Sequence, residues 1–253
     1  MFVEGLVSVI IPVYNSSKFI KETILSAVNQ SYKKIEVVLV DDCSSDNSVE
    51  IIERLQTQFK NIFLYKNKKN SGAGVSRNAA IGYARGQYIA FLDSDDVWDK
   101  EKIKKQLNDL KMEGGSFSYT AIEMIDQDGV IKKKKRKIKR KVSYRFLLKN
   151  TVIPTSTVVI DRNVVGDFRM SHRRGGQDYA TWLEIIKISG FAYGIDEPLC
   201  KYRVGRKDSL AGNKWKSIKQ VWSIQREDQH IGRIRVMFNV ACFIFNALKK
   251  YLL

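Results

Sequence analysis

The chain has 253 residues, of which 44% are hydrophobic and 28% charged, a composition that excludes an intrinsically disordered chain and leaves room for a sizeable core. Its net charge of +17 implies an anionic partner, either nucleic acid, acidic lipid headgroups or a phosphorylated substrate. The three cysteines, Cys43, Cys200 and Cys242, lie far apart without CxxC spacing, which argues against a disulfide framework or a zinc site and indicates a reducing compartment.

The first apolar run, Leu6–Val13, is nearly unbroken, which predicts a strand buried on both faces of a parallel sheet. It follows Met1 so closely that no signal peptide is visible, and we therefore expect a cytoplasmic protein. Apolar strands then alternate with amphipathic helices. Further strands are expected at Ile35–Val40, Ile62–Tyr65 and Tyr88–Leu92, and helices after Ser16 or Ser17, after Asp46, through Arg77 to Ala84 and over Lys100–Met112.

This alternation predicts a doubly wound parallel sheet with right-handed crossovers. In such sheets, ligands bind outside the carboxyl ends of the strands. The polar side chains at the predicted strand ends are Asn15, Asp41, Asp42, Asp93, Asp95 and Asp96. One crevice can therefore collect all of them.

The fourth predicted strand runs straight into an acid cluster formed by Asp93, Asp95 and Asp96. Neighbouring carboxylates resist ionising side by side, and a divalent cation resolves this conflict. Hard oxygen ligands suit Mg²⁺ or Mn²⁺, and such a cation commonly holds a phosphate-bearing substrate. The alternative is an acidic loop that caps the following helix, because Asp is a good N-cap residue.

The second half is less regular. A hairpin turn is expected at Asp128–Gly129, followed by a run, Lys132–Lys141, in which every residue except Ile138 is basic. We expect a strand at Thr157–Ile160 and a helix over Asp178–Ile188. No clear linker separates the two halves, so we expect them to share one core.

Six short motifs follow one another along the chain. They are residues 7–15 (VSVIIPVYN), 40–46 (VDDCSSD), 74–78 (GVSRN), 91–96 (FLDSDD), 177–183 (QDYATWL) and 202–203 (YR). Together they resemble the motifs of the family 2 inverting glycosyltransferases, over roughly residues 6 to 210. That family has the GT-A fold and uses nucleotide sugars.

The resemblance implies an α/β fold of the GT-A type, with a doubly wound, mostly parallel sheet. It implies a Rossmann-like half that binds the nucleotide sugar at residues 1–112 and an integrated half with the acceptor site and the catalytic base at residues 113–212. Residues 213–253 would form C-terminal amphipathic helices that associate with a membrane. The implied donor is a UDP-sugar, with galactose or glucose as the sugar.

The resemblance also implies roles for individual residues. Those that would bind the nucleotide sugar are Pro12, Tyr14, Asn15, Asp41, Asp42, Arg77, Asp93 and Arg203. Asp93 and Asp95 would address the ribose and a Mn²⁺ or Mg²⁺ ion, with Asp96 as an alternative metal ligand. The metal would neutralise the departing diphosphate. Asp178 would be the general base that takes the proton from the acceptor hydroxyl.

Three of these residues also have plain structural explanations. The alternative for Asp41 is a turn residue, for Arg77 a surface charge on a helix, and for Asp178 a helix N-cap. Geometry has to decide among these alternatives.

The chain departs from the family pattern at three positions. Gln177 stands where the family usually has Glu, which removes a like charge beside the base, and Cys43 stands where it often has Gly. Gly205 stands where many relatives have His, so Arg203, Arg206 or Lys207 would have to supply that contact.

The acceptor is expected at a membrane. The apolar run Val236–Leu248 is too short to span a bilayer and is therefore expected to be interfacial or buried. Basic residues flank it, and the Lys132–Lys141 run adds to an attraction for anionic lipid unless it is simply a solvated basic hairpin.

We therefore expect a peripheral protein at the inner face of the cell membrane that extends an undecaprenyl-diphosphate-linked or similar glycan. Residues 155–161, 175–183 and 192–201 resemble bacterial transferases that assemble O-antigen (as in lipopolysaccharide biosynthesis), capsule or teichuronic-type polysaccharide.

Other functions fit less well. A nucleic-acid-binding protein would need aromatic residues within the Lys132–Lys141 run, which has none, so no nucleic-acid partner is expected. A Rossmann dehydrogenase would need the motif G-x-G-x-x-G after the first strand, where this chain has Tyr14-Asn-Ser-Ser and therefore lacks the turn that binds the pyrophosphate. A glycosidase would use two carboxylates but leaves the metal-like cluster unexplained. A nucleotidyltransferase shares the metal and remains an alternative, although no Gly- or Arg-rich phosphate loop follows the first strand.

Overall fold

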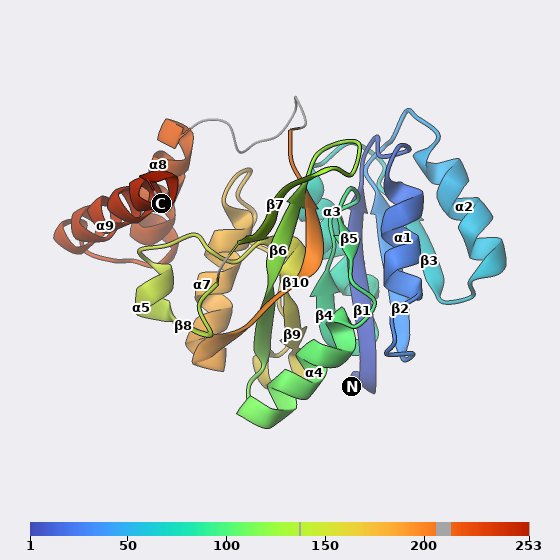
Figure 1. Ribbon diagram of the computed structural model, residues 1–253, viewed down its shortest axis with the longest axis horizontal. Coiled ribbons are helices and arrows are strands. Elements are labelled where there is room, and N and C mark those ends of the chain that lie inside the picture. Colours follow the sequence, from blue (N-terminus) through green and yellow to red (C-terminus); the bar gives the residue numbers. More distant parts are fainter. Residues whose placement is uncertain (137, 206–213, 253) are drawn as a thin grey trace.

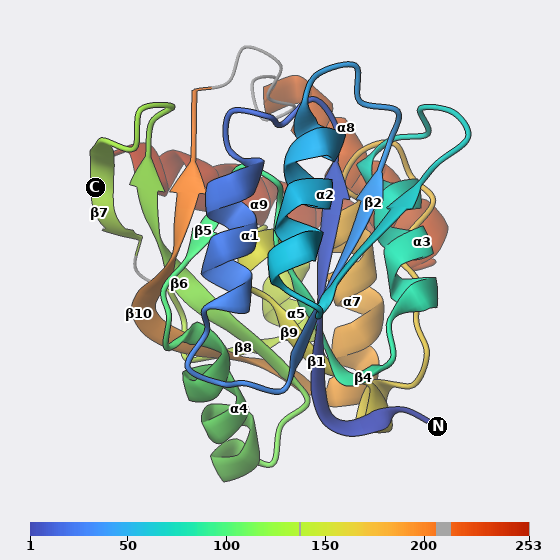
Figure 2. The same cartoon turned by 90° about the vertical axis from the view of Figure 1, so that its right-hand side faces the viewer.

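The computed structural model describes residues 1–136, 138–205 and 214–252. One large sheet runs through the molecule, with helices on both of its faces (Figures 1 and 2). Its strand order is β3-β2-β1-β4-β9-β6-β10-β5, with β7 paired to β6 and β8 to β10. The strands are β1 (Val3–Val13), β2 (Ile35–Asp41), β3 (Ile62–Lys66), β4 (Gly86–Phe91), β5 (Val97–Trp98), β6 (Phe117–Ile125), β7 (Ile131–Arg136), β8 (Lys141–Ser143), β9 (Val159–Asp161) and β10 (Phe191–Arg203).

The N-terminal part of the sheet is parallel, as the sequence predicts. Strand β1 pairs in parallel with both β2 and β4, and β2 pairs in parallel with β3. Every residue of β2 is buried, because helices cover both faces of the sheet at this point. The four strands therefore end at one edge, and the loops that follow them meet there.

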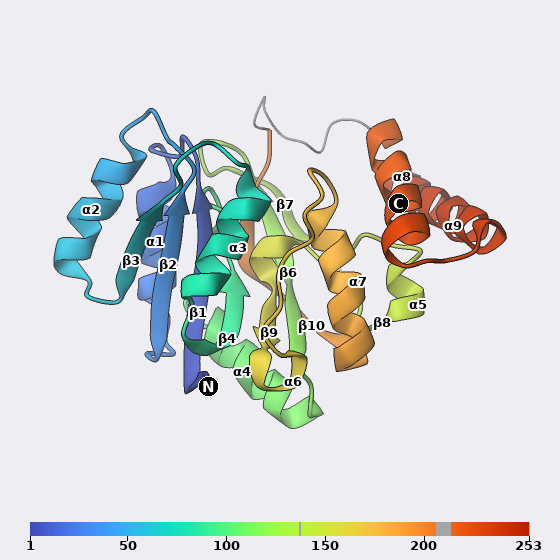
Figure 3. The same cartoon turned by 180° about the vertical axis from the view of Figure 1, so that it is seen from behind.

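The helices occupy two layers. On one face lie α1 (Ile20–Val28), α2 (Ser48–Gln58) and α4 (Lys102–Glu113), and on the other lie α3 (Ala73–Tyr83) and α7 (Gln177–Ser189) (Figures 1 and 3). Two short helices, α5 (Tyr144–Leu147) and α6 (Arg162–Val165), and a 3₁₀ turn, Thr155–Thr157, complete the second half.

Two helices begin differently from the sequence prediction. Helix α1 has Phe19 as its N-cap, and the Ser16 hydroxyl instead lies 2.7 Å from that of Ser94. Helix α2 has Asn47 as its N-cap. The carboxylate of Asp46 accepts hydrogen bonds from the backbone N–H of Ser48 within α2 and from that of Ser17 in the loop after β1. Both expected capping residues are thus used to tie loops together.

The second half mixes strand directions. Strand β9 runs antiparallel to both β4 and β6, whereas β10 is parallel to β6. The expected hairpin turn is confirmed between β6 and β7, where the Asp126 N–H donates to the Val130 carbonyl oxygen at 2.9 Å. Strand β9 pairs with two strands that come well before it in the chain, so these antiparallel pairings are long-range contacts.

The described residues of the basic run Lys132–Lys141 lie in β7, in the segment before β8 and, with Lys141, at the start of β8. Several of its side chains pair with acidic residues of the protein itself. These pairs are Lys132–Asp126 at 2.8 Å, Lys135–Asp196 at 2.7 Å and Arg140–Asp109 at 2.7 Å. The geometry favours the alternative that this run is a basic hairpin of the fold.

Both halves of the chain share the hydrophobic core. One buried cluster joins Ile10 of β1 to Trp182 of α7, and a second cluster on the opposite face joins Val9 of β1 to Cys200 of β10. The Trp182 ring packs edge-on against Phe91 at the end of β4, with ring centroids 5.4 Å apart. This contact fixes α7 beside the strand that leads into the acid cluster.

The C-terminal part forms a separate helical layer at one end of the sheet. It consists of α8 (Lys214–Ser223), a π-helical turn at Ile224–Asp228 and α9 (Arg233–Leu252) (Figures 1 and 3). Val236 and Val240 of α9 pack into the core cluster that contains Trp182. Within the part of the chain that the structure describes, no helix is long and apolar enough to cross a membrane.

Candidate functional site

A pocket of about 500 Å³ lies where β1, β4 and β10 end, and we call it the strand-end pocket. It collects nearly all the residues that the sequence singles out: Pro12, Tyr14, Asn15, Asp42, Arg77, Asp93, Asp95, Asp96 and Arg203. Val13, Ala73, Ser76, Ser94, Tyr202 and Gly205 complete its lining. Asp41 and Asp178 are not among the lining residues.

The loops after β1 and β2 are tied together at the rim of the pocket. The side-chain oxygen of Asn15 accepts a hydrogen bond from the Ser45 N–H at 2.8 Å, and the Asn15 N–H donates to the Ser44 hydroxyl at 3.0 Å. Cys43 has a φ of 64°, in the left-handed region that glycine adopts most easily. This backbone conformation explains why the family often has Gly at this position.

Asp42 shapes the third loop of the pocket. Its carboxylate accepts hydrogen bonds from the Asn67 side chain at 2.7 Å and from the N–H groups of Ser71 and Gly72 at 2.9 and 2.6 Å. Gly72 is the N-cap of α3, so Asp42 fixes the start of that helix. Asp41 instead accepts from the Ser44 N–H at 3.1 Å, which agrees with the turn role that the sequence left open for it.

Arg77 is not a surface charge. It is 8% exposed, and its guanidinium lies 2.5 Å from the Asp93 carboxylate in a partly buried ion pair. The Asp93 N–H donates to the Ser156 hydroxyl at 3.0 Å. The Nε–H of Arg77 is buried and has no hydrogen-bond partner among the described residues. Arg77 thus balances one carboxylate of the cluster and retains one unused donor.

Asp96 lies beneath the pocket and is fully buried. One of its carboxylate oxygens accepts from the Arg203 N–H at 2.8 Å, and the other has no hydrogen-bond partner among the described residues. Burial, followed by the negative charges of Asp93 and Asp95, raises the pKa of Asp96 well above its ordinary value. The acid cluster therefore carries the like-charge conflict that its sequence predicts.

Arg203 holds this acid loop in place. Its guanidinium donates to the backbone carbonyls of Asp95 at 2.9 Å and Asp126 at 2.8 Å, and to the Glu22 carboxylate at 3.2 Å, and it lies over the Phe19 ring. With its side chain 3% exposed, the guanidinium is committed to the protein. Direct binding of the nucleotide sugar by Arg203 stays a prediction, whereas its support of the loop is visible in these contacts.

Asp178 lies in the first turn of α7. The N-cap of this helix is Gly176, so the alternative that Asp178 caps it is wrong. One carboxylate oxygen of Asp178 accepts from the Tyr179 N–H at 2.8 Å, and the Thr155 hydroxyl lies 3.5 Å from the other. Neither contact neutralises the carboxylate.

Thr155 and Ser156 connect Asp178 to the acid cluster. The Thr155 hydroxyl lies 3.5 Å from the Asp178 carboxylate, and the hydroxyl of the next residue, Ser156, accepts from the Asp93 N–H at 3.0 Å. Burial, followed by the negative charges of Asp96, Asp93, Asp95 and Asp178, raises the pKa of Tyr202, which lines the pocket. The proposed base thus lies near the strand-end pocket, although it does not line it.

Gln177 connects the two halves across this region. A Cβ atom placed on Gly74, in the first turn of α3, would overlap the side-chain oxygen of Gln177. The first turns of α3 and α7 are therefore in direct contact, and a larger residue at position 74 would displace the amide end of Gln177.

The donor atoms of the acid cluster suit a hard divalent cation. Among residues 1–136, 138–205 and 214–252, no group of three or more Asp, Glu, His or Cys side chains is arranged to hold a metal ion. Mg²⁺ commonly takes one or two protein carboxylates and completes its shell with water and substrate phosphates. The unbonded buried oxygen of Asp96 and the repulsion within the cluster fit a cation of that kind.

Ser156 is an important residue that the sequence analysis missed. It supports Asp93 and also accepts, through its carbonyl oxygen, from the Trp98 indole at 2.7 Å. Its position beside β4 depends on the antiparallel pairing of β9, which no local motif signals.

Gly205, which stands where many relatives have His, lines the pocket with a φ of 88°. Of the expected substitutes for that His, Arg203 is described above, and Arg206 and Lys207 lie outside the described residues.

Comparisons with known proteins agree with one another. The model of the family described as glycosyl transferase family 2 matches residues 8–175. The putative teichuronic acid biosynthesis glycosyltransferase TuaG of Bacillus subtilis is 40% identical over 250 residues, covering 98% of both chains. The UDP-Glc:alpha-D-GlcNAc-diphosphoundecaprenol beta-1,3-glucosyltransferase WfgD of Escherichia coli is 34% identical, covering 97% of this chain and 95% of its own.

Among solved structures, TarS of S. aureus in complex with UDP-GlcNAc is similar, with a TM-score of 0.70 and 20% identity. The match covers 94% of this chain and 71% of the TarS chain. At this identity, the similarity concerns the fold alone.

Replacing Arg203 tests its structural role. Arg203→Ala leaves buried carbonyl groups without donors, so we expect the free energy of unfolding to fall by about 3 kcal/mol in a denaturant titration. Arg54→Ala, which removes an exposed ion pair on α2, should change it by less than about 0.5 kcal/mol. Unchanged stability combined with weakened UDP binding would show that Arg203 serves the ligand instead.

Replacing Asp96 tests the like-charge conflict. Because folding raises the pKa of Asp96, the folded state binds this proton more tightly, and the stability from this group is lost as the pH rises through the raised pKa. In metal-free buffer at pH 8, Asp96→Asn should raise Tm by about 2 °C or more, the effect of about 1 kcal/mol in a domain of this size.

This gain in Tm should shrink as the pH is lowered toward about 4, the ordinary pKa of an aspartate. Asp128→Asn, at an exposed hairpin position, is the matched control and should show no such trend. A Tm difference for Asp96→Asn that does not vary with pH would contradict the assignment.

Proposed function

The chain belongs to glycosyl transferase family 2, and we propose that it is an inverting hexosyltransferase that moves glucose or galactose from a UDP-sugar to a lipid-diphosphate-linked glycan. The family and the GT-A fold agree with the sequence prediction. The observation that carries the proposal is the strand-end pocket, where the acid cluster, Arg77 and the Asn15 loop meet, with Asp178 held nearby through the Thr155–Ser156 segment.

The nucleotide would occupy the N-terminal side of the pocket. Pro12, Tyr14 and Asn15 line this side, and the Asn15 loop is fixed by its hydrogen bonds to Ser44 and Ser45. Asp42 both lines the pocket and fixes the start of α3, so it would define the shape of the base and ribose site. UDP is the proposed nucleotide because WfgD is named for UDP-Glc and TarS was solved with UDP-GlcNAc.

The diphosphate would lie beside Arg77 and the acid cluster. The buried Nε–H of Arg77 offers a donor that the protein does not use among its described residues. Asp95, together with Asp93 or Asp96, would hold Mn²⁺ or Mg²⁺, which would neutralise the negative charge that develops on the departing diphosphate. Arg77 pairs with Asp93 and orients its carboxylate, and Arg203 keeps the loop of Asp95 and Asp96 at the pocket.

Asp178 would act as the general base. Inversion at the sugar carbon requires the acceptor hydroxyl to attack from the side opposite to the leaving diphosphate. The base must therefore approach from another element than the acid cluster, and α7 provides it. Asp178 carries no ion pair among its described contacts, so its carboxylate is free to take the proton of the hydroxyl.

The acceptor and the cellular location are proposed from the named relatives. WfgD and a second relative from Escherichia coli, WfaP, are named for GlcNAc-diphosphoundecaprenol acceptors, and TuaG for teichuronic acid biosynthesis. We therefore place this chain in the assembly of a cell-surface polysaccharide such as O-antigen, capsule or teichuronic acid. It would act as a peripheral protein at the inner face of the membrane, with no nucleic-acid partner.

Asp178→Asn is the direct test of the base. The variant keeps the shape of the side chain but removes its basicity, so kcat for transfer should fall at least about 10²-fold while the Kd for UDP-sugar stays nearly unchanged. Glu184→Gln, on the same helix and away from the pocket, is the matched control and should retain full activity. Transfer by the Asn variant at the wild-type rate would refute the base assignment.

Removal of the divalent ion tests the acid cluster. Transfer should be lost on exhaustive chelation and return with Mn²⁺ or Mg²⁺, and Asp95→Ala should lower kcat by about 10²-fold or more even at saturating metal. The measurement is nucleotide release from UDP-, GDP- and dTDP-sugars with a synthetic diphosphate-lipid acceptor, with Asp128→Ala as the control. Undiminished turnover in chelator would exclude a metal role in this reaction.

A further inference from the structure

Helix α9 has an inverted distribution of polar and apolar side chains. Its two asparagines face the protein. Asn239 is buried and donates to the side-chain oxygen of Gln225 at 2.8 Å, and Asn246 donates to the Lys149 carbonyl oxygen at 3.2 Å. A surface helix in water normally turns such groups outward, so α9 uses its polar groups to attach itself to the protein.

The outward face of α9 is apolar. Its exposed side chains form a line that we call the α9 ridge: Ile234, Met237, Phe238, Ala241, Phe245 and Leu248. The spacings of three and four residues place them on one side of the helix, over a length of about 20 Å at 1.5 Å per residue. Phe245 is 68% exposed and Ile234 86%. A continuous ridge of this size is unusual on the free surface of a soluble monomer.

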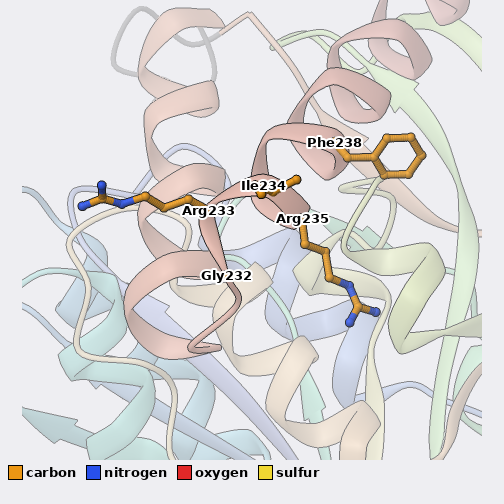
Figure 4. A pocket seen from close by; sticks show the side chains of 5 residues that line it. All are labelled: Gly232, Arg233, Ile234, Arg235 and Phe238. Carbon is orange, nitrogen blue, oxygen red and sulfur yellow. The ribbon is translucent and has the colours of Figure 1, made fainter.

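Basic groups border the ridge. Arg233 and Arg235 extend to opposite sides of Ile234, as Figure 4 shows, and with Phe238 they line an open hollow of about 890 Å³. The ammonium group of Lys149 lies 4.6 Å from the centre of the Phe238 ring. The sequence of α9 contains no acidic residue. An apolar strip bordered by cations is complementary to the interfacial layer of an anionic bilayer.

Two other arrangements fit the ridge less well. Insertion across the bilayer does not fit, because no described helix is long and apolar enough to span it. A symmetric pair of α9 ridges would bring the arginines of two copies together without any acidic residue on α9 to balance them. Paired helices normally place opposite charges beside the apolar seam.

We infer that the α9 ridge lies in the plane of an anionic bilayer, with its apolar side chains in the headgroup–acyl boundary and its arginines at the lipid phosphates. The inference rests on the proposed function in one respect, since a diphosphate-lipid acceptor places the enzyme's substrate in the same membrane. Asn239 bonds to Gln225, whose side chain in turn donates to the Tyr179 hydroxyl of α7 at 3.2 Å, so these bonds connect the ridge to the helix that carries Asp178. Asn246 attaches the ridge to Lys149, after α5.

The test is sedimentation of the full chain with vesicles. Phosphatidylcholine vesicles with an equal part of phosphatidylglycerol should bind the protein, and pure phosphatidylcholine vesicles should bind it much more weakly. The double substitution Phe238→Ser and Phe245→Ser should weaken binding at least tenfold, because both rings are largely exposed and replaceable without damage to the core. Arg233→Gln with Arg235→Gln should weaken binding by about fivefold per arginine.

A matched control removes apolar side chains of similar exposure elsewhere. Met112→Ser with Val164→Ser alters α4 and α6 and should bind vesicles like the wild type. Equal vesicle binding by the ridge variant and the wild type would overturn the inference. So would a concentration-dependent dimer, seen by light scattering, that the ridge variant abolishes, because the ridge would then be the contact between two copies.

A second measurement separates this inference from the proposed function. Nucleotide release with a short-chain, water-soluble diphosphate acceptor should be the same for the ridge variant and the wild type, since no ridge residue lines the strand-end pocket. Vesicle binding without any transfer would refute the function and leave the docking surface standing. Transfer without vesicle binding would refute the docking surface alone.

Discussion

The repulsion among the carboxylates after β4 is the constraint on which the rest of the site depends. Three aspartates within four residues end a buried strand, and Asp96 is forced entirely out of solvent. The protein balances them with two buried arginines that act differently. Arg77 pairs with the Asp93 carboxylate, whereas Arg203 binds backbone carbonyls and offers its N–H to Asp96. The remaining imbalance is the feature that supports the proposed divalent cation.

This arrangement explains why the two halves of the chain cannot be separate domains. Arg203 comes from β10, in the second half, and supports a loop of the first half. Trp182, from the second half, packs against Phe91 at the end of β4, which sets the distance between α7 and the acid loop. The proposed general base and leaving-group site would need a fixed separation, and a shared core provides it more rigidly than a domain interface would.

Sequence reasoning predicted the parallel half of the fold and most of the pocket for one physical reason. Buried parallel strands are continuous apolar runs, and the polar residues that follow them must meet at one edge. It did not predict the roles of individual side chains where contacts between distant parts of the chain determine them. Whether Asp41 or Asp42 lines the pocket depends on which carboxylate reaches the Asn67–Gly72 loop. The commitment of Arg203 to carbonyl groups, and the arrival of Ser156 beside Asp93, follow from strand pairings that carry no local signal.

The asparagines of α9 show how one segment can satisfy two environments. In the sequence alone, Asn239 and Asn246 interrupt an apolar run that is too short to span a bilayer. In the folded chain both side chains bond inward, so every exposed side chain between Val236 and Leu248 is apolar. An enzyme held on a bilayer by such a face, as we propose for this chain, would meet a lipid-linked acceptor within a thin layer, where the effective concentration of that acceptor is far higher than in the bulk. A water-soluble donor would need no such concentration, and no residue of α9 lines the strand-end pocket proposed to bind it.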